Sequence, residues 1–130
     1  MGRITSAARG RTRAQVRVAA QAKEVRRYEV RWATLDPVQG GEMAKTRPVV
    51  IVSLDVLNER LSTITVCPLT SSLHPGWRSR VPVRVGQRNA EIAVDQIRSI
   101  SKSRLGKKLG KLSDAEALAL RMVITEMFGE

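Results

Sequence analysis

Side chains that build many familiar functional sites are scarce in this sequence. Aromatic residues make up 3% of its 130 residues, so the chain lacks the several exposed rings on which aromatic-rich RNA-binding modules stack bases. It has one cysteine, Cys67, and one histidine, His74. A single cysteine cannot form an internal disulfide, and a single histidine excludes a paired-histidine acid–base site within one chain. We expect Cys67, which lies in a strand-like segment, to be a small core residue.

Motifs for metals, nucleotides and membranes are missing as well. No H-E-x-x-H, cysteine pair or acidic cluster supplies metal ligands, and neither a phosphate-binding G-x-x-x-x-G-K-[ST] loop nor a G-x-S-x-G nucleophile elbow occurs. No run of about 18 apolar residues could span a membrane, and there is no apolar secretory core near the N-terminus. We therefore expect a cytosolic protein with no metal, no cofactor and no membrane partner.

Positive charge is what the sequence has in excess. It contains 23 Lys and Arg against 12 Asp and Glu, a formal net charge of +11, which predicts a polyanionic partner. Residues 1–23 hold six of the basic side chains and no acid, with few large apolar residues to offset the entropy of ordering. We expect residues 1–23 to be a flexible basic arm, with an organellar transit peptide as the alternative, and residues 24–130 to form one domain.

The pattern of this domain indicates short β-strands. Strand-like segments occupy residues 28–34, 49–52, 63–69, 80–85, 91–94 and 97–100. Pro82 favours a sheet edge for its strand, Ser53 is a candidate cap for a short helix over residues 54–60, and the glycines at 106 and 110 favour a basic turn. Short strands joined by turns predict a small, curved antiparallel barrel.

The C-terminal segment has the pattern of a helix. Ser113 and Glu116 have the spacing of a capping box, and Gly129 is placed to end the helix. Apolar side chains recur on one face, at Leu120, Val123, Ile124, Met127 and Phe128. We expect this face to pack in the core or in a dimer rather than to bind a ligand.

The stretch from Lys45 to Ser53 carries the most specific chemical signal. Its sequence, K-T-R-P-V-V-I-V-S, places an arginine and a proline directly before four β-favouring aliphatics. Pro48 is expected at the first position of that strand, where its missing N–H costs no ladder bond. Arg47 then lies at the mouth of the strand and points outward. Because a guanidinium is always charged and binds phosphate in a forked geometry, Arg47 is a candidate anion site.

Three further motifs occur in a fixed order around this one. A strand ending in Asp36-Pro37 precedes it, P-L-T-S-S at residues 68–72 follows it, and D-Q-I-R at residues 95–98 comes last. Over roughly residues 25–129 this order resembles the MazF/PemK toxins of toxin–antitoxin pairs. The resemblance implies an SH3-like antiparallel barrel of the CcdB/MazF/Kid type with appended helices and a two-fold dimer. It also implies metal-independent, sequence-selective cleavage of single-stranded mRNA, leaving a cyclic phosphate and a free 5′-hydroxyl, and a cognate antitoxin as partner.

The resemblance also assigns site residues. The family's essential arginine falls on Arg47, its strand-end threonine on Thr70, its loop glutamate on Glu42 and its D-Q aspartate on Asp95. With a pKa above about 12, an arginine is a poor proton donor at neutral pH, so we expect Arg47 to act chiefly as an electrostatic clamp. Glu42 is the candidate general base, or else a loop carboxylate pairing with a neighbouring cation. Asp95 is either catalytic or orders the end of the barrel, and we favour the second.

Basic and polar residues near these motifs are expected to bind RNA. Two acid-free basic runs, over residues 78–88 and 102–111, together with Arg47, predict a track for RNA or for an acidic antitoxin segment. The sequence has Ala93 and Thr46 where some family members have a second arginine and a histidine, which places two-arginine and histidine-assisted mechanisms in doubt. The expected RNA-binding residues are Lys45, Thr46, Ser71, Ser72, Arg78, Arg80, Gln96 and Arg98.

Two other functions fit the same fold. A CcdB-like toxin poisons a topoisomerase by binding protein, through a tryptophan near its C-terminus. This chain instead ends Met127-Phe128-Gly129-Glu130, which disfavours that function. A non-catalytic RNA-binding module of the same fold is the third alternative.

Overall fold

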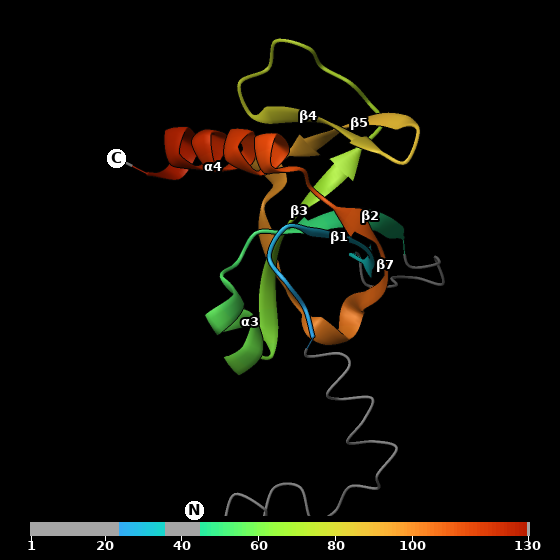
Figure 1. The fold of residues 1–130 in the computed structure, drawn as a ribbon, viewed down its shortest axis with the longest axis vertical. Helices are drawn as coiled ribbons and strands as arrows, with labels where there is room; N and C mark the ends of the chain where they lie inside the picture. The colour runs from blue at the N-terminus through green and yellow to red at the C-terminus, as the bar shows by residue number, and fades with distance from the viewer. Residues whose placement is uncertain (1–23, 36–44, 130) are drawn as a thin grey trace, which may run out of the picture.

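A curled antiparallel sheet with a C-terminal helix forms the body of the protein, as the computed structural model shows for residues 24–35 and 45–129 (Figure 1). The predicted fold class, mainly β with a curved antiparallel barrel and a C-terminal helix, is confirmed. The proposed basic arm, residues 1–23, and the candidate base Glu42 lie outside the described residues. The strands are β1 (Glu29–Thr34), β2 (Thr46–Ile51), β3 (Thr63–Thr70), β4 (Arg80–Val85), β5 (Arg88–Ala93), β6 (Arg98–Ser101) and β7 (Leu105–Lys111).

Strand β3 organises the sheet because it is long enough to pair with three neighbours. The strand order is β4-β5-β3-β2-β1-β7, and β6 pairs with β3 off this path. The first half of β3 pairs with β6, and its last two residues pair with β5. Strand β4 is at one edge, as Pro82 predicted, and β7 is at the other. Because β2 and β3 are antiparallel neighbours, the start of β2 lies toward the end of β3, in the middle of the sheet.

Strand β2 is buried on both faces, which explains its unbroken aliphatic sequence. Val49 and Ile51 pack into one core cluster, and Val50 and Val52 pack into the other. The second of these clusters also contains Leu120 of helix α4 (Asp114–Phe128), which lies beside β4 and β5 (Figure 1). The sheet is thus held from both sides, and only the start of β2 reaches solvent.

Helix α4 has the predicted capping box. The Glu116 N–H donates to Ser113 Oγ at 3.1 Å, and the Ser113 N–H donates to Glu116 Oε1 at 2.9 Å. Gly129 ends the helix as expected. The predicted apolar face is divided: Leu120 is fully buried, whereas Phe128 is 58% exposed.

Three local expectations were wrong. Residues 106–110 form part of strand β7, not a basic turn, and they pair with β1 through two irregularities of register. Ser53 does not cap the short helix α3 (Asp55–Arg60), whose N-cap is Leu54. Its hydroxyl instead donates to Asn58 Oδ1 at 2.6 Å and accepts from the Thr65 N–H at 3.1 Å. Pro48 is the third residue of β2, not the first, and lies opposite Trp32.

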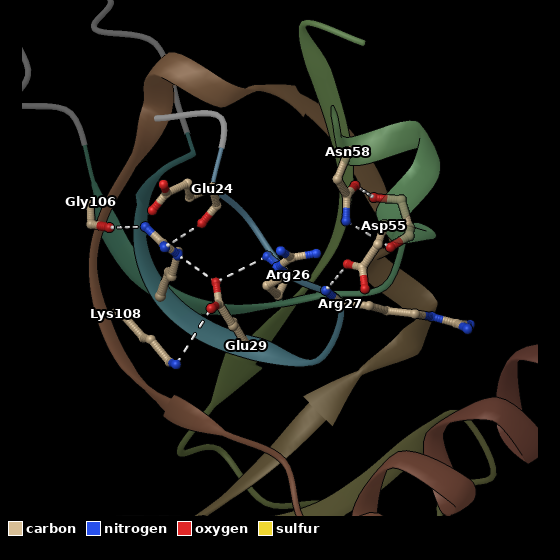
Figure 2. A network of polar contacts seen from close by, with 10 residues as sticks. Glu24, Arg26, Arg27, Glu29, Asp55, Asn58, Gly106 and Lys108 are labelled. Atoms are coloured by element: carbon tan, nitrogen blue, oxygen red, sulfur yellow. Dashed lines mark hydrogen bonds and ion pairs between the residues drawn. The ribbon is translucent and has the colours of Figure 1, made fainter. Parts of the chain in front are cut away.

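A buried carboxylate ties β1 to β7 (Figure 2). Glu29 is 5% exposed and bonds Arg31 Nε at 3.0 Å, Lys108 Nζ at 3.4 Å and the Arg26 N–H at 3.2 Å. Burial acts to raise the pKa of Glu29, but the Arg26 N–H, the Arg31 guanidinium and the Lys108 charge together hold it below its ordinary value. The ionised form of Glu29 is therefore the one that the fold stabilises.

The one cysteine is buried, as predicted. Cys67 lies in β3 opposite Val50 and is 0% exposed. Burial, assisted by the negative charge of Asp95, raises the pKa of its thiol to about 12. Cys67 is therefore a core side chain rather than a nucleophile.

Candidate active site

Arg47 is an exposed arginine near the start of β2, with a buried strand directly behind it. Its backbone lies opposite Ala33 of β1, which is 1% exposed. Among the described residues its guanidinium has no hydrogen bond or ion pair. A charged group fixed by its strand and left without a partner is available to an anionic ligand.

Thr70 lies at the end of the neighbouring strand. The β2–β3 ladder ends at the pair of Val49 with Pro68, two residues before Thr70, and Thr70 lines the same cavity as Arg47. The Thr70 hydroxyl oxygen accepts a hydrogen bond from the Ser72 N–H at 3.0 Å. Because one lone pair is used in this way, the hydroxyl is oriented and its proton remains free to donate to a ligand. The structure thus brings together the two residues expected to contact phosphate.

A cavity of about 450 Å³ opens beside these two residues. Two arginines, an asparagine and two hydroxyl groups lie among apolar side chains, and none of the described residues that form the lining is acidic. Its wall consists of Trp32, Arg47, Pro48, Leu69, Thr70, Ser71, Val85, Arg88, Asn89, Ala90 and Leu109. The cavity is therefore suited to a ligand that is anionic at one end and apolar at the other.

A second, smaller cavity also has Arg47 in its lining. It measures about 240 Å³ and is lined by Leu35, Arg47, Pro68, Gln96 and Arg98. Arg47 therefore contributes to both cavities. Gln96 and Arg98, both predicted to bind RNA, are thereby placed at the same site.

Four other predicted RNA-binding residues lie beside this centre. Lys45 and Thr46 are exposed and precede Arg47 directly. The carbonyl of Lys45 accepts a hydrogen bond from the Leu35 N–H at 3.1 Å, which fixes the backbone there. Ser71 and Ser72 are exposed and follow Thr70. All four remain candidates for RNA contact.

Arg80 has a different position from the one expected. Its side chain is 7% exposed and bonds Glu91 Oε1 at 3.3 Å and Asp95 Oδ1 at 3.2 Å. It also donates to the Ser72 carbonyl at 3.2 Å and lies 4.9 Å from the centroid of the Trp77 ring. Arg80 therefore holds the loop of residues 71–79 against the sheet, and we replace its expected RNA contact with this structural role.

Asp95 is part of the same contacts, because its carboxylate is bonded to Arg80. Burial acts to raise the pKa of its carboxyl, but hydrogen bonds from Ser79 and from Arg80, with the Arg80 charge, hold that pKa below its ordinary value. Asp95 is thus ionised and engaged with Arg80, which supports the structural alternative over a catalytic one. Arg78, also expected to bind RNA, forms an ion pair with Glu126 of α4 and lines neither cavity next to Arg47.

Trp32, Arg88 and Asn89 line the larger cavity, although they were not predicted as site residues. Arg88 was recognisable as part of a basic run, but nothing in its local sequence indicated which cavity it would face. Trp32 carried one usable signal, because a large aromatic residue in the strand before the R-P motif can pair with that motif. Its pairing with Pro48 is visible only in the sheet register.

Comparison with known proteins identifies the family. The sequence profile described as "PemK-like, MazF-like toxin of type II toxin-antitoxin system" matches residues 26–128. The chain belongs to this family. The predicted resemblance is therefore confirmed over nearly the whole segment on which it was based.

Individual relatives agree with this assignment. The Endoribonuclease MazF of Staphylococcus epidermidis is 32% identical over 102 residues, which cover 72% of this chain and 82% of that protein. The structure of the Mycobacterium tuberculosis toxin MazF-mt6 is 27% identical, with a TM-score of 0.66, over 77% of this chain and 95% of that one. A MazE–MazF structure from Deinococcus radiodurans has a TM-score of 0.68 at 22% identity, over 81% and 96% of the two chains, and shows the shared MazF fold.

Two features were searched for among the described residues. Within residues 24–35 and 45–129, no group of three His, Cys, Asp or Glu side chains is placed to hold a metal ion. No helix in the same segments is long and apolar enough to cross a membrane.

Proposed function

We propose that this protein is a toxin endoribonuclease that cleaves single-stranded RNA at selected sequences without a metal ion. The observation that carries the proposal is the position of Arg47, which has no partner among the described residues, lines two cavities and shares the larger one with Thr70. Family membership supports it, since the relative from Staphylococcus epidermidis is an endoribonuclease by name.

The chemistry follows from what RNA brings to the site. The ribose 2′-hydroxyl attacks the adjacent phosphorus, the bond from phosphorus to the 5′-oxygen breaks, and a 2′,3′-cyclic phosphate and a 5′-hydroxyl result. One proton leaves the attacking hydroxyl and one reaches the departing oxygen. The protein has to align these atoms and stabilise the extra negative charge that the phosphorane develops.

Arg47 and Thr70 fit the second of these tasks. A fixed guanidinium stabilises charge that appears on the non-bridging oxygens, most strongly where the surrounding cavity excludes water. The free proton of Thr70 donates to the same phosphate. We propose Glu42 as the base for the 2′-hydroxyl, because it precedes Arg47 by five positions in the sequence.

We further propose that the protein acts in the cytoplasm as a homodimer and is neutralised by a cognate antitoxin. The net charge of +11 favours an acidic partner segment as well as RNA. The exposed side of α4, which includes Leu118, Met122 and Phe128, supplies apolar surface for a dimer contact. MazF of Deinococcus radiodurans has been solved together with MazE.

The decisive experiment uses purified protein on a long RNA with mapped cut sites. Cleavage is expected to continue in excess EDTA and to leave 2′,3′-cyclic phosphate and 5′-hydroxyl ends. A substrate with a single 2′-deoxy nucleotide at a mapped cut should bind but resist cleavage there. Activity that disappears with EDTA and returns with added metal would overturn the mechanism. If the protein binds RNA but cleaves it under no condition tested, it is a non-catalytic RNA-binding module instead.

A further inference from the structure

The Trp32 ring is exposed in the larger cavity without serving either hydrophobic core. It is 39% exposed and contributes to the cavity wall with Arg47 and Thr70. Neither core cluster includes Trp32, and it is not among the apolar residues that pack against them. A large aromatic side chain that is neither core nor isolated surface indicates a binding role.

The second tryptophan, Trp77, has ring contacts within the protein that Trp32 does not have among the described residues. Trp77 is stacked on His74, with centroids 3.8 Å apart and planes 13° from parallel, and the Arg80 guanidinium lies 4.9 Å from its centroid. No aromatic or cationic group makes such a contact with Trp32 among the described residues. Trp32 can therefore offer a ring face to a ligand, whereas Trp77 is engaged within its own loop.

The backbone positions Trp32 close to the phosphate site. Trp32 pairs with Pro48, and its neighbour Ala33 pairs with Arg47, so the two side chains leave opposite faces of the sheet. Both nevertheless line the larger cavity, which lies where β2 begins. Gly106 of β7 lies beside Trp32, since a Cβ there would be in ordinary van der Waals contact with the Trp32 Cβ at 3.5 Å.

The chemistry of the cavity selects the ligand. Arg47 and Arg88 supply positive charge, Leu69, Val85 and Leu109 supply apolar surface, and the described part of the wall holds no carboxylate. A nucleotide has the matching parts, since its phosphate is anionic and its base is a flat apolar ring with polar edges. Base–aromatic stacking tolerates any base, so a polar group is needed to discriminate among bases. Asn89 provides an amide at the same wall.

We propose that Trp32 stacks one base of the RNA next to the phosphate held by Arg47, and that Asn89 bonds the edge of this base. This inference rests on the proposed ribonuclease function and adds a base subsite to it. It assigns to one ring the task that several rings perform in aromatic-rich RNA-binding modules.

A binding measurement tests the stack independently of cleavage. Trp77→Phe leaves Trp32 as the only tryptophan, so its fluorescence reports on the cavity. The probe is a random-sequence hexadeoxynucleotide, which lacks the 2′-hydroxyl and is not cut by the proposed path. It is expected to quench Trp32 fluorescence in a saturable way. An abasic hexamer with the same phosphates should leave the fluorescence nearly unchanged at equal concentration.

The alternatives to stacking give different results in this assay. Equal quenching by the abasic hexamer would mean that only phosphate charge is sensed, and absence of quenching by either probe would mean that no base reaches the ring. Stronger quenching by an oligoglutamate peptide than by the nucleotide would assign the cavity to an acidic protein segment. Each of these three outcomes overturns the inference.

A cleavage measurement then tests the consequence for selectivity. Trp32→Ala should slow cutting at mapped sites by about 10-fold or more, the scale of one lost stacking contact, and should relax the preference at one nucleotide position beside the cut. Trp32→Phe, which keeps a ring, should stay within about threefold of the parent. Asn89→Ala should relax the same position while cutting continues.

The two proposals fail separately. If the parent protein cuts RNA and Trp32→Ala cuts it with unchanged rate and preference, the base subsite is refuted and the ribonuclease function stands. If the parent protein cuts no RNA, the ribonuclease proposal is refuted, and the quenching assay still decides whether a base stacks on Trp32. Should Trp32→Ala fail to fold, Trp32→Phe, Asn89→Ala and the quenching assay carry the test.

Discussion

Arg47 has a different environment from Arg31 and Arg80, which are strand arginines engaged in ion pairs. Its guanidinium has no such partner within the described residues, so removing it should cost little stability. Arg47→Ala is expected to reduce RNA cleavage by ~10²-fold or more, the scale of one lost transition-state charge contact, while the thermal melting curve stays near that of the parent. Arg60→Ala, an exposed change on α3, is the matched control.

A folded Arg47→Ala protein that cleaves RNA at the parent rate would remove Arg47 from the mechanism. Arg47→Lys distinguishes charge from geometry, because lysine keeps the positive charge but cannot form the forked contact. A partial loss in this variant would indicate that the bidentate geometry contributes.

Glu29 makes stability depend on acid pH. Folding holds its pKa below the ordinary value of 4.5, so the unfolded chain binds the proton more readily than the native one. The Glu29 contribution is therefore fully present above the unfolded pKa and is lost as the pH falls through the folded pKa. Glu29→Gln should lower stability at neutral pH and flatten the loss between neutral and acid pH, as measured by urea unfolding over a pH series. A parallel decline of parent and variant with acidification would contradict this assignment.

At the scale of elements, the loop of residues 71–79 depends on one buried ion pair. The Arg80 and Glu91 side chains are each 7% exposed, and Glu91 also accepts the His74 N–H at 3.0 Å. Arg80→Ala leaves the Glu91 carboxylate buried without its counter-charge, which should cost about 3 kcal/mol of the free energy of unfolding. Urea denaturation measures this loss, and limited proteolysis should show new cuts within residues 71–79.

Arg78 offers the matched control for this prediction. It lies in the same loop and its ion pair with Glu126 is solvent-exposed, with 84% of the Arg78 side chain accessible. Exposed pairs contribute little because water screens them and side-chain entropy opposes them. Arg78→Ala should therefore change stability by about 0.5 kcal/mol or less. An equal loss in both variants would mean that the Arg80 pair is no stronger than a surface contact.

The elements that sequence predicted well are those with local signals. The aliphatic run of β2 and the capping box and periodicity of α4 are each contained within a few turns or residues. Strand β7 was missed because its glycines and lysines resemble a turn, and its pairing with β1 comes from residues about 75 positions earlier in the chain, as the Arg31 bond to the Gly106 carbonyl illustrates. Ser53 had the composition of a helix cap, but its hydroxyl is used by Asn58 and Thr65.

The candidate site was predictable to the extent that its residues lie at strand ends. Arg47 and Thr70 were predicted from motifs, and both line the larger cavity. Arg80 was misplaced because its alternating strand gives no indication that Glu91 and Asp95, eleven and fifteen residues later, would face it. Trp32 was missed because its role depends on what surrounds its ring, which only the assembled sheet determines.

For the whole molecule, residues 1–23 remain a predicted accessory segment. They carry six positive charges and no acid and precede the matched family region, residues 26–128. Deleting them should leave the melting temperature and the cleavage sequence unchanged, and should weaken RNA binding at low salt with a shallower salt dependence. Melting curves and binding over a salt series measure both effects. A large fall in melting temperature would show that this segment belongs to the folded domain.

The buried thiol of Cys67 can report on the rate at which the sheet opens. Its thiol is 0% exposed in the central strand, and burial raises its pKa to about 12, so a chromogenic disulfide reagent can react only after β3 separates from its neighbours. The rate of labelling should therefore depend on opening of the sheet and should not change with movements of the loop of residues 71–79, which Arg80 holds. Arg80→Ala tests whether the loop of residues 71–79 and the sheet open together. If labelling in this variant accelerates only as much as the loss of global stability requires, the loop and the sheet open together. If the loop is released without faster labelling, they open separately.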